Sequence, residues 1–319
     1  MKSAKVLHNP NAGDGDNSDK ELMDAIAAEG YKCSYLSTKK KGWDKAWDKI
    51  ESTDIDFIIV AGGDGTVRKL AGELLDRKVI DKKLPIALLP LGTANNIAKT
   101  LGITGGAEEI IKSWKQHEVK KYDVGRIEGI KNHKFFIESY GHGVFPRLMK
   151  EMGKLDKSSF ESPEQKIKVA WQILYDIILR YKTKLCRLNI DGEDYTGKFL
   201  LVEIMNTSSI GPNLQLAPFA DPGDESFDVV LITESQRQQF ADYLKGKLEG
   251  KKEAPFFTVL KAKKIQIYWE GTALHVDDEH ILLDKPADVR IELHPGLLEF
   301  LVPQPNKVNV PGPNSKITD

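Results

Sequence analysis

The pattern of apolar and polar residues divides the chain into two parts. Up to about Lys115, short apolar runs alternate with longer segments in which apolar residues recur at helical spacing. This alternation is typical of a doubly wound α/β sheet. The predicted strands are Lys5–His8, Lys32–Ser37, Phe57–Ala61 and Ile86–Pro90, and the predicted helices are Asp19–Glu29, Trp43–Glu51, Thr66–Asp76, Asn95–Leu101 and Ala107–Gln116.

From about Tyr122 the pattern becomes rich in strands and predicts a β-sandwich with two helical insertions. The helices are expected at Gly143–Met152 and Pro163–Lys182. The strands are expected at Asp123–Ile127, Lys134–Ser139, Leu185–Ile190, Phe199–Asn206, Phe227–Thr233, Lys264–Tyr268, His280–Leu283 and Val289–Leu293. We therefore predict an α/β domain over residues 1–118, a β-sandwich domain over 119–302 and a flexible Pro- and Asn-rich tail over 303–319.

Three predicted strands of the first domain end in turns of small and polar residues. These turns are Asn9-Pro10 with Gly13, Gly62-Gly63-Asp64-Gly65-Thr66, and Gly92-Thr93. Glycines let the backbone approach a bulky anion, and a helix that follows directs its free N–H groups at that anion. Because the ends of parallel strands share one edge of the sheet, the turns can converge on one phosphate-bearing ligand. Tight turns without a ligand remain the alternative.

Asp64 is unusual in a turn that would bind only an anion, because a carboxylate repels phosphate. It fits if a divalent metal lies between the two, or if the carboxylate takes part in the chemistry.

The motifs NPxAG, GGDGT and PLGTxN, in this order and spacing, resemble the diacylglycerol kinase catalytic-domain family, which includes bacterial soluble lipid kinases and sphingosine kinases. The resemblance implies an N-terminal nucleotide-binding domain and a C-terminal lipid-substrate domain. It also implies transfer of the γ-phosphate of ATP, with Mg²⁺, to a lipid hydroxyl such as that of diacylglycerol or a sphingoid base. Its more distant relatives, the NAD kinases, give the first alternative function.

The resemblance also assigns roles to residues. Asp64 and Glu279 would share the metal and base roles with Asp277 beside them, and Asn96 would be a further catalytic position. The nucleotide and its phosphates would be held by Asn9, Pro10, Gly13, Thr38, Gly62, Gly63, Gly65, Thr66, Arg68, Gly92 and Thr93.

Two acidic turns compete for the family's Asp-Gly-Glu motif in the sandwich. Ile190–Glu193 contains Asp-Gly-Glu and matches the motif fully, but it lies between two predicted strands and is explained as a hairpin turn. Val276–Glu279 has Asp278 where Gly is usual, but its place late in the sandwich matches better. We therefore predict that residues 276–279 return to the nucleotide cleft.

Two further acidic segments resemble family sites. Residues 217–228, APFADPGDESFD, resemble a stretch that carries a structural magnesium, which would make Asp221, Asp224 and Ser226 metal ligands. Asp123 matches an acid near the polar head of the acceptor. An acidic loop and a surface acid at a strand edge are the respective alternatives.

Three positions depart from the family pattern. Arg68-Lys69 replaces a usual Asn-Glu pair, Asn96 stands where lipid kinases commonly have Asp, and Asp278 replaces a glycine. An amide can neither bind a metal as a charged ligand nor accept a proton as a base. These departures leave a nucleotide-binding regulatory protein without catalysis as the second alternative.

Composition and charge agree with a two-domain enzyme. The chain has 319 residues, which exceeds the usual single core. Its net charge is −1, so no nucleic-acid partner is expected. Two cysteines far apart, Cys33 and Cys186, indicate reduced thiols.

No apolar run approaches the roughly 20 residues that span a bilayer, and the first residues lack the apolar core of a signal peptide. We expect a cytoplasmic protein with no transmembrane segment that meets its lipid substrate peripherally and transiently at the membrane surface. Lys39-Lys40-Lys41 near Trp43 and Trp47 suits either a membrane contact or a solvated helix start. The sequence leaves a homodimer open.

Overall fold

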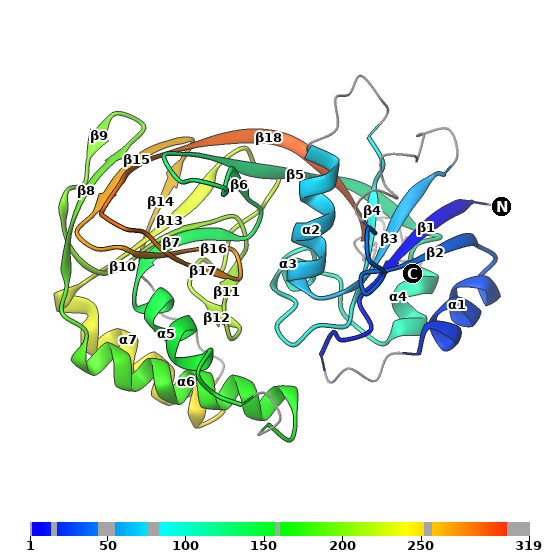
Figure 1. Ribbon diagram of the computed structural model, residues 1–319, viewed down its shortest axis with the longest axis horizontal. Coiled ribbons are helices and arrows are strands. Elements are labelled where there is room, and N and C mark those ends of the chain that lie inside the picture. Colours follow the sequence, from blue (N-terminus) through cyan, green and yellow to red (C-terminus); the bar gives the residue numbers. More distant parts are fainter. Residues whose placement is uncertain are drawn as a thin grey trace, which may run out of the picture.

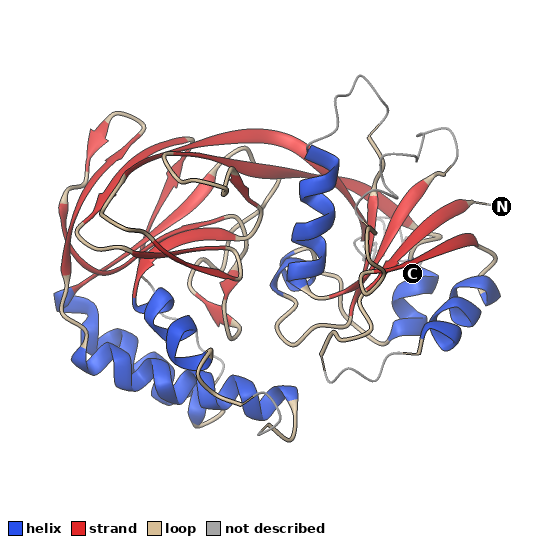
Figure 2. Ribbon diagram, viewed as in Figure 1, coloured by secondary structure: helices blue, strands red, loops and turns tan. Residues whose placement is uncertain are grey.

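The computed structural model describes residues 2–13, 18–43, 55–75, 83–156, 160–251 and 257–304. The chain forms an α/β domain and a β-sandwich domain that lie side by side and are joined by two long strands (Figures 1 and 2).

The α/β domain is built on a parallel sheet with the strand order β2-β1-β3-β4. Its strands are β1 (Ser3–His8), β2 (Lys32–Ser37), β3 (Phe57–Gly62) and β4 (Ile86–Pro90), and its helices are α1 (Asp19–Ala28), α2 (Asp64–Leu75), α3 (Asn96–Thr100) and α4 (Ala107–Ser113). Helices α1 and α4 lie together, whereas α2 lies between the sheet and the second domain (Figure 1). From β1, the chain adds β2 on one side of the sheet and β3 and β4 on the other, so the strand order reverses between β1 and β3. Open α/β sheets bind ligands at such a reversal.

The strands β5 (His117–Glu128) and β18 (Asp288–Pro303) run through both domains. They pair antiparallel over their whole length, with a bulge between His294 and Leu298. The end of β18 pairs parallel with β4, and Phe300 and Leu301 are buried in the core of the α/β domain. The boundary predicted at residue 118 therefore falls inside a strand, and β18, the last strand among the described residues, completes the sheet of the first domain.

The second domain is a β-sandwich. One sheet contains β8 (Lys184–Ile190), β15 (Lys264–Trp269), β18, β5 and β6 (Phe135–Phe136), with β9 (Glu193–Asp194) at its edge. The other contains β17 (Glu279–Leu282), β16 (Ala273–Val276), β7 (Ser139–Gly143), β10 (Gly197–Met205), β13 (Phe227–Thr233) and β14 (Thr258–Ala262), and β11 (Ser209–Ile210) pairs with β12 (Leu214–Gln215) nearby. The start of β10 pairs with β8 and joins the two sheets.

Helices α5 (Val144–Met152), α6 (Pro163–Arg180) and α7 (Arg237–Leu248), the last preceded by the short 3₁₀ helix Glu234–Gln236, cover the outer face of the second sheet (Figure 1). Strand β10 is therefore buried on both faces: Val202 and Ile204 pack in the sandwich, whereas Leu201 and Met205 pack toward the helices. Pro163 at the first turn of α6 and the Ser162 hydroxyl, which accepts from the Gln165 N–H, define where α6 begins.

The predicted fold class is confirmed, with local corrections. The segment predicted as one strand, Lys134–Ser139, is divided between β6 and β7, and α7, β14 and β16 were not predicted. The predicted helix Trp43–Glu51, apart from Trp43, lies outside the described residues, as do Trp47 and most of the predicted tail. Both cysteines are free thiols.

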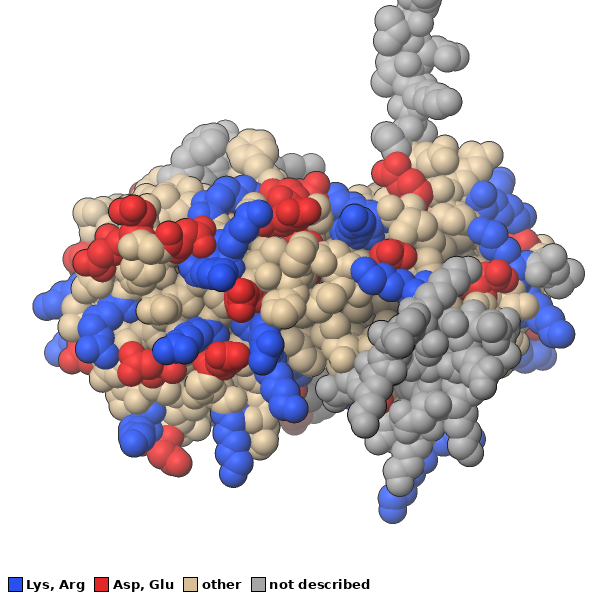
Figure 3. Space-filling view, turned by 90° about the horizontal axis from the view of Figure 1, so that it is seen from above, with Lys and Arg blue, Asp and Glu red and all other residues tan. Residues whose placement is uncertain are grey.

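The surface carries charges of both signs in a mixture. On the face in Figure 3, basic and acidic side chains of the described residues are interspersed over both domains. None of the helices in the described part of the chain is long and apolar enough to cross a membrane.

Candidate active site

The glycine turns of β3 and β4 touch through their backbones. A Cβ on Gly92 would lie 2.5 Å from the Cα of Gly63, so a side chain at position 92 would collide with the backbone of the neighbouring turn. The Leu91 N–H donates to the Gly62 carbonyl at 3.0 Å and holds the turns in register. The convergence of these strand ends, predicted from the sequence, is present.

Asp64, the first residue of α2, joins these turns to α3. Its carboxylate accepts from the backbone N–H groups of Asn96 at 2.9 Å and Ile97 at 3.1 Å. Burial raises the pKa of Asp64, these two hydrogen bonds lower it, and the negative charge of Asp278 raises it. The carboxylate thus fixes the start of α3 and keeps its remaining lone pairs in the cleft.

Asp277 holds the acidic turn in the cleft. Its backbone is left-handed, with φ 51°, and its carboxylate accepts from the backbone N–H groups of Glu138 at 2.8 Å and Ser139 at 3.1 Å. The Arg68 Nε donates to the same carboxylate at 2.9 Å. Burial raises the pKa of Asp277 to about 6, although Arg68 lowers it. Asp277 therefore positions the turn rather than facing the cleft with a free carboxylate.

Asp278 and Glu279 point in different directions. A Cβ on Gly65 would lie 2.7 Å from Asp278 Oδ2, so this carboxylate lies directly over the glycine turn. The Glu279 side chain, 47% exposed, pairs with Arg68 Nη1 at 2.7 Å and with His133 Nε2 at 3.0 Å. Glu279 thus binds Arg68 and also lines a cavity over the glycine turns, whereas Asp278, the departure from the family pattern, faces Asp64.

Asn96 and Glu138 form a buried polar pair. Asn96 Nδ2 donates to Glu138 Oε2 at 3.1 Å and to the Gly211 carbonyl at 3.3 Å. Burial raises the pKa of Glu138 well above its ordinary value, and the charges of Asp64 and Asp277 add to this effect. Glu138 is not among the site residues predicted from the sequence. Its only signal is an acid directly after the apolar run Phe135–Ile137.

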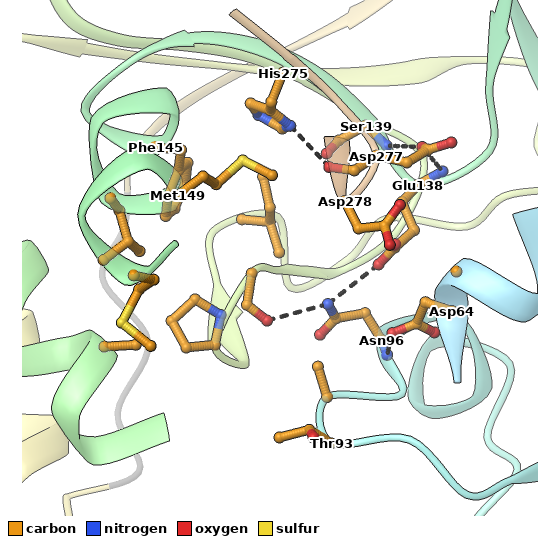
Figure 4. Close-up of a pocket in the computed structure, with 18 of the residues that line it drawn as sticks. Asp64, Thr93, Asn96, Glu138, Ser139, Phe145, Met149, His275, Asp277 and Asp278 are labelled. Carbon is orange, nitrogen blue, oxygen red and sulfur yellow. Dashed lines mark hydrogen bonds between the residues drawn. The ribbon is translucent and has the colours of Figure 1, made fainter. Parts of the chain in front are cut away.

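Two cavities meet at the acidic turn. One, of about 400 Å³, has an apolar end between α5 and α6 and a polar inner end. Its apolar end is lined by Phe145, Leu148, Met149, Met152, Ile167, Ala170, Ile210 and Pro212, and its polar end includes Asp64, Thr93, Asn96, Glu138, Ser139, Asp277 and Asp278 (Figure 4). We call this the apolar cavity.

The other, of about 280 Å³, lies over the glycine turns, and we call it the glycine cavity. It is lined by Asn9, Ala12, Gly63, Gly65, Thr66, Arg68, Lys69, Gly92, Asp278 and Glu279. Gly63, Gly65 and Asp278 line both cavities, so a group bound in one meets a group bound in the other at Asp278.

Most residues predicted to hold a nucleotide lie at this junction. Asn9 Nδ2 donates to Thr66 Oγ1 at 3.3 Å, which links the first turn to the second. Pro10, Gly13, Thr38 and Gly62 line neither cavity. Gly13, with φ +64°, packs against the Leu91 carbonyl, and the Thr38 N–H donates to the His8 carbonyl, so both support the strand ends.

Asp123 does not lie in the cleft, contrary to the sequence assignment. It is 1% exposed, and its two carboxylate oxygens accept from the backbone N–H groups of Gly296 at 2.7 Å and Glu225 at 2.9 Å. It ties the bulge of β18 to the acidic loop, and it has no free oxygen turned toward either cavity.

The predicted magnesium loop is neutralised by lysines instead. Lys261 Nζ lies 2.8 Å from Asp224 Oδ2 and 2.9 Å from Asp228 Oδ2. Lys120 pairs with Asp221, and Ser226 donates to Asp224. Because ammonium groups take the place of a cation, the structure gives no support to Asp221, Asp224 and Ser226 as metal ligands.

The choice between the two acidic turns is settled by position. Asp191 and Gly192, both with positive φ, form the hairpin turn between β8 and β9, and Asp191 accepts from the Lys263 and Lys264 N–H groups. Asp277, Asp278 and Glu279 instead line the two cavities of the cleft.

The residues of the cleft fit a divalent cation bound together with phosphate. Asp64 and Asp278 face each other across the glycine turn, and the charge of Asp278 raises the pKa of Asp64, so a cation between them would relieve repulsion. Within the described ranges, no group of three or more His, Cys, Asp and Glu side chains is arranged to hold a metal by itself. Phosphate oxygens and water would complete the coordination.

The fold and the site define a class of two-domain proteins in which the glycine turns of an α/β domain face an acidic turn of a β-sandwich. A family model of the diacylglycerol kinase catalytic domain matches residues 3–127, and a model of the YegS C-terminal NAD kinase beta sandwich-like domain matches residues 156–302. The chain belongs to the diacylglycerol kinase catalytic-domain family.

Curated proteins that resemble the chain are named diacylglycerol kinases. The chain is 22% identical over 304 residues to the diacylglycerol kinase of Bacillus subtilis (strain 168), covering 92% of this chain and 86% of that protein. It is 25% identical over 295 residues to that of Staphylococcus aureus (strain MRSA252), covering 88% and 86%. A solved structure of a diacylglycerol kinase from Bacillus anthracis str. Sterne has a TM-score of 0.69 at 24% identity, covering 94% of this chain and 97% of that one, and supports the fold.

Proposed function

We propose that the protein is an ATP-dependent lipid kinase that transfers the γ-phosphate to a lipid hydroxyl, with diacylglycerol as the first candidate acceptor. The observation that carries the proposal is the meeting of the two cavities at Gly63, Gly65 and Asp278. One cavity offers glycines at the start of a helix and the basic side chains of Arg68 and Lys69, which suits a triphosphate. The other offers an apolar chamber with carboxylates at its inner end, which suits a lipid that presents a hydroxyl.

Each group in the cleft then has a role. The backbone around Gly63–Thr66 and Gly92 would orient the phosphates. Asp64 and Asp278 would hold Mg²⁺, which when bound neutralises charge on the phosphate oxygens. The apolar cavity would exclude water from the acceptor hydroxyl and align it with the γ-phosphate, and much of the rate would come from this alignment.

The apolar lining favours this function over that of an NAD kinase. An NAD kinase must place a polar dinucleotide opposite the phosphates of ATP, whereas the chamber between α5 and α6 is lined by Phe145, Leu148, Met149 and Met152. Its volume of about 400 Å³ lies in the usual range for a small-molecule site. The lipid would be collected peripherally from a membrane surface.

The test is a labelling experiment. Purified protein is incubated with γ-labelled ATP, Mg²⁺ and a total lipid extract, and the labelled product is identified by mass spectrometry. We expect a phosphorylated lipid from the wild-type protein and from Glu193→Gln, a change in the exposed β8–β9 hairpin. Asp64→Asn should abolish labelling. ATP binding without a labelled lipid would instead favour a regulatory nucleotide-binding protein.

A further inference from the structure

Glu138 is the acid of the cleft to which the sequence motifs give no role. It follows β6, is 7% exposed, and lies between the glycine turns and the sandwich. Its backbone N–H is bound by Asp277, so its position is fixed by the same contact that fixes the acidic turn. A buried carboxyl group of this kind is costly to keep in a core unless it serves the site.

The two cavities distinguish Glu138 from the other carboxylates. Asp278 lines both cavities, whereas Glu138 lines the apolar cavity and is absent from the lining of the glycine cavity. Figure 4 shows Glu138 near Asp278 and Asn96 at the polar end of the apolar cavity. A side chain at this position can contact a ligand in the apolar cavity between α5 and α6. It does not contact a ligand in the glycine cavity.

Asn96 holds one oxygen of Glu138 and leaves the other available. The Asn96 amide donates to Glu138 Oε2 at 3.1 Å, and the same amide is held by the Gly211 carbonyl at 3.3 Å. Among the described residues, no hydrogen bond to Glu138 Oε1 is present. The geometry therefore presents one free carboxylate oxygen to the polar end of the apolar cavity.

The other acids of the cleft are less suited to accept a proton. Both oxygens of Asp64 already accept backbone N–H groups, from Asn96 and Ile97, so neither is without a donor as Glu138 Oε1 is. Asp278 is exposed and lines both cavities, where it would face the phosphates of a bound nucleotide.

We propose that Glu138 is the general base of the site, with Asn96 as the residue that positions it. The assignment rests on the proposed lipid kinase function. In the step, the acceptor hydroxyl gives its proton to Glu138 Oε1, its oxygen forms a bond to the γ-phosphorus, and the bond from the γ-phosphorus to the bridging oxygen breaks. ADP leaves with that electron pair, and Glu138 returns the proton to solvent after product release.

The charges that face Glu138 support this role. They come from Asp64 on α2 and from Asp277 and Asp278 on the β16–β17 turn, and the phenol of Tyr122 on β5 is also near. Burial raises the pKa of Glu138 well above its ordinary value, and these negative charges add to the shift. A base is most effective when its pKa lies near the working pH. Cation binding beside Asp64 and Asp278 would remove part of the repulsion and favour the ionised form.

The first experiment measures turnover and binding of Glu138→Gln, which keeps the shape and the acceptor for Asn96. With a diacylglycerol in detergent micelles, we expect kcat to fall at least about 100-fold. The Kd for Mg²⁺·ATP should stay within about threefold, because Glu138 does not line the glycine cavity. The rise of kcat with pH in the wild type should be absent in the variant. An unchanged kcat, or a loss confined to nucleotide binding, overturns the assignment.

The second experiment needs neither nucleotide nor metal. Urea unfolding of the wild type, Glu138→Gln and the control Glu193→Gln is compared from pH 5 to pH 8. A folded-state pKa above the unfolded value makes the wild type lose stability relative to Glu138→Gln as the pH rises through that pKa. Glu193→Gln should follow the wild type. Parallel pH dependence of all three proteins overturns the assignment.

The experiments distinguish a failure of the proposed lipid kinase function from a failure of the assignment of Glu138 as the base. If the wild-type protein phosphorylates no lipid, the proposed function fails and this assignment fails with it. If the wild type phosphorylates lipid and Glu138→Gln does so equally well, this assignment alone fails.

Discussion

At the scale of single residues, the acidic turn shows how a departure from a family pattern changes which side chain faces the chemistry. The carboxylate of Asp277 accepts hydrogen bonds from the backbone N–H groups of residues 137–139 and from Arg68. Arg68, itself a departure, also binds Glu279. Asp278, which stands where the family has a glycine, therefore lies above Gly65 and beside Asp64. Two of the three departures, Arg68 and Asp278, are therefore parts of one local arrangement around the acidic turn.

This arrangement predicts unequal effects of two neutralising substitutions. Asp278→Asn should lower kcat about 100-fold, because it removes a charge that would hold the cation. Glu279→Gln should lower kcat less than about threefold, because an exposed ion pair contributes little. Steady-state kinetics of both variants checks this. Equal losses, or a larger loss for Glu279→Gln, would restore the role that the sequence gave to Glu279.

Asn96 gives a second prediction. Asn96→Asp would replace the donor to Glu138 and Gly211 by a second carboxylate, so we expect about 1–3 kcal/mol lower stability and a lower rate. Adding Glu138→Gln to this variant restores an acid–amide pair and should recover most of the stability, a non-additivity that thermal melts measure. A gain in rate for Asn96→Asp alone would indicate an attenuated kinase that lacks an acid at this position.

His142 gives a prediction about pH. Its ring stacks on Trp269 at 5.4 Å, and its nitrogens lie 2.8 Å from Tyr140 Oη and 3.2 Å from the Ala273 carbonyl. Burial lowers the pKa of His142 to about 3. Because the unfolded histidine binds a proton near pH 6.5 and the folded one does not, its contribution to stability is present above pH 6.5 and is lost as the pH falls below it.

The measurement is the slope of the unfolding free energy between pH 7 and pH 5. We expect His142→Gln to have a flatter slope than the wild type, by up to about 1.4 kcal/mol per pH unit. The opposite contribution of Asp277, whose pKa is raised to about 6, is common to both proteins and cancels in the difference. Identical slopes would show that His142 is protonated in the folded protein.

Sequence reasoning found those residues whose placement depends on their neighbours in the chain. Asp64 and its glycines lie in one strand–turn–helix, so the motif fixes their geometry. Glu138 was missed because its place depends on Asp277, 139 positions away, and on Asn96 from another domain. Asp123 was misplaced because backbone N–H groups of Gly296 and Glu225, distant in sequence, take both of its oxygens.

At the scale of elements, strands with a clear pattern were predicted to the residue, as in β2, β4 and β13. Helix α7 was missed because its buried Phe240, Ala241, Tyr243 and Leu244 are dispersed among charged residues. The continuation of β18 past Leu293 was missed because His294, Pro295 and Gly296 form a bulge that interrupts the alternation.

The end of β18 gives a prediction about stability. Phe300 is fully buried in the core of the α/β domain, with its ring 4.9 Å from that of Tyr122. Phe300→Ala should lower the free energy of unfolding by about 3–5 kcal/mol, because it leaves a cavity between β18 and β5. Phe219→Ala, at a side chain that is 83% exposed, is the matched control and should change little. Urea unfolding of both variants decides whether the end of β18 belongs to this core.

At the scale of the whole molecule, the cleft gives a prediction about ligand-linked stability. ATP with Mg²⁺ at 100 times its Kd should raise the free energy of unfolding by about 2.7 kcal/mol. Asp64→Asn should show a smaller increase at the same ligand concentration, because one of the two facing carboxylates is lost. Thermal melts with and without the nucleotide measure both. A wild-type protein that ATP does not stabilise would contradict nucleotide binding itself.

The completion of the first domain by β18 also has a consequence for synthesis on the ribosome. The glycine turns emerge early, but β4 receives its neighbour Phe300–Leu301 only after the whole sandwich has been made. At about 5–20 residues per second, that delay is on the order of ten seconds. During this time the edge of β4 is an unpaired strand that another nascent chain could join. The order in which the ribosome synthesises the chain therefore makes the α/β domain the first to begin folding and among the last to finish.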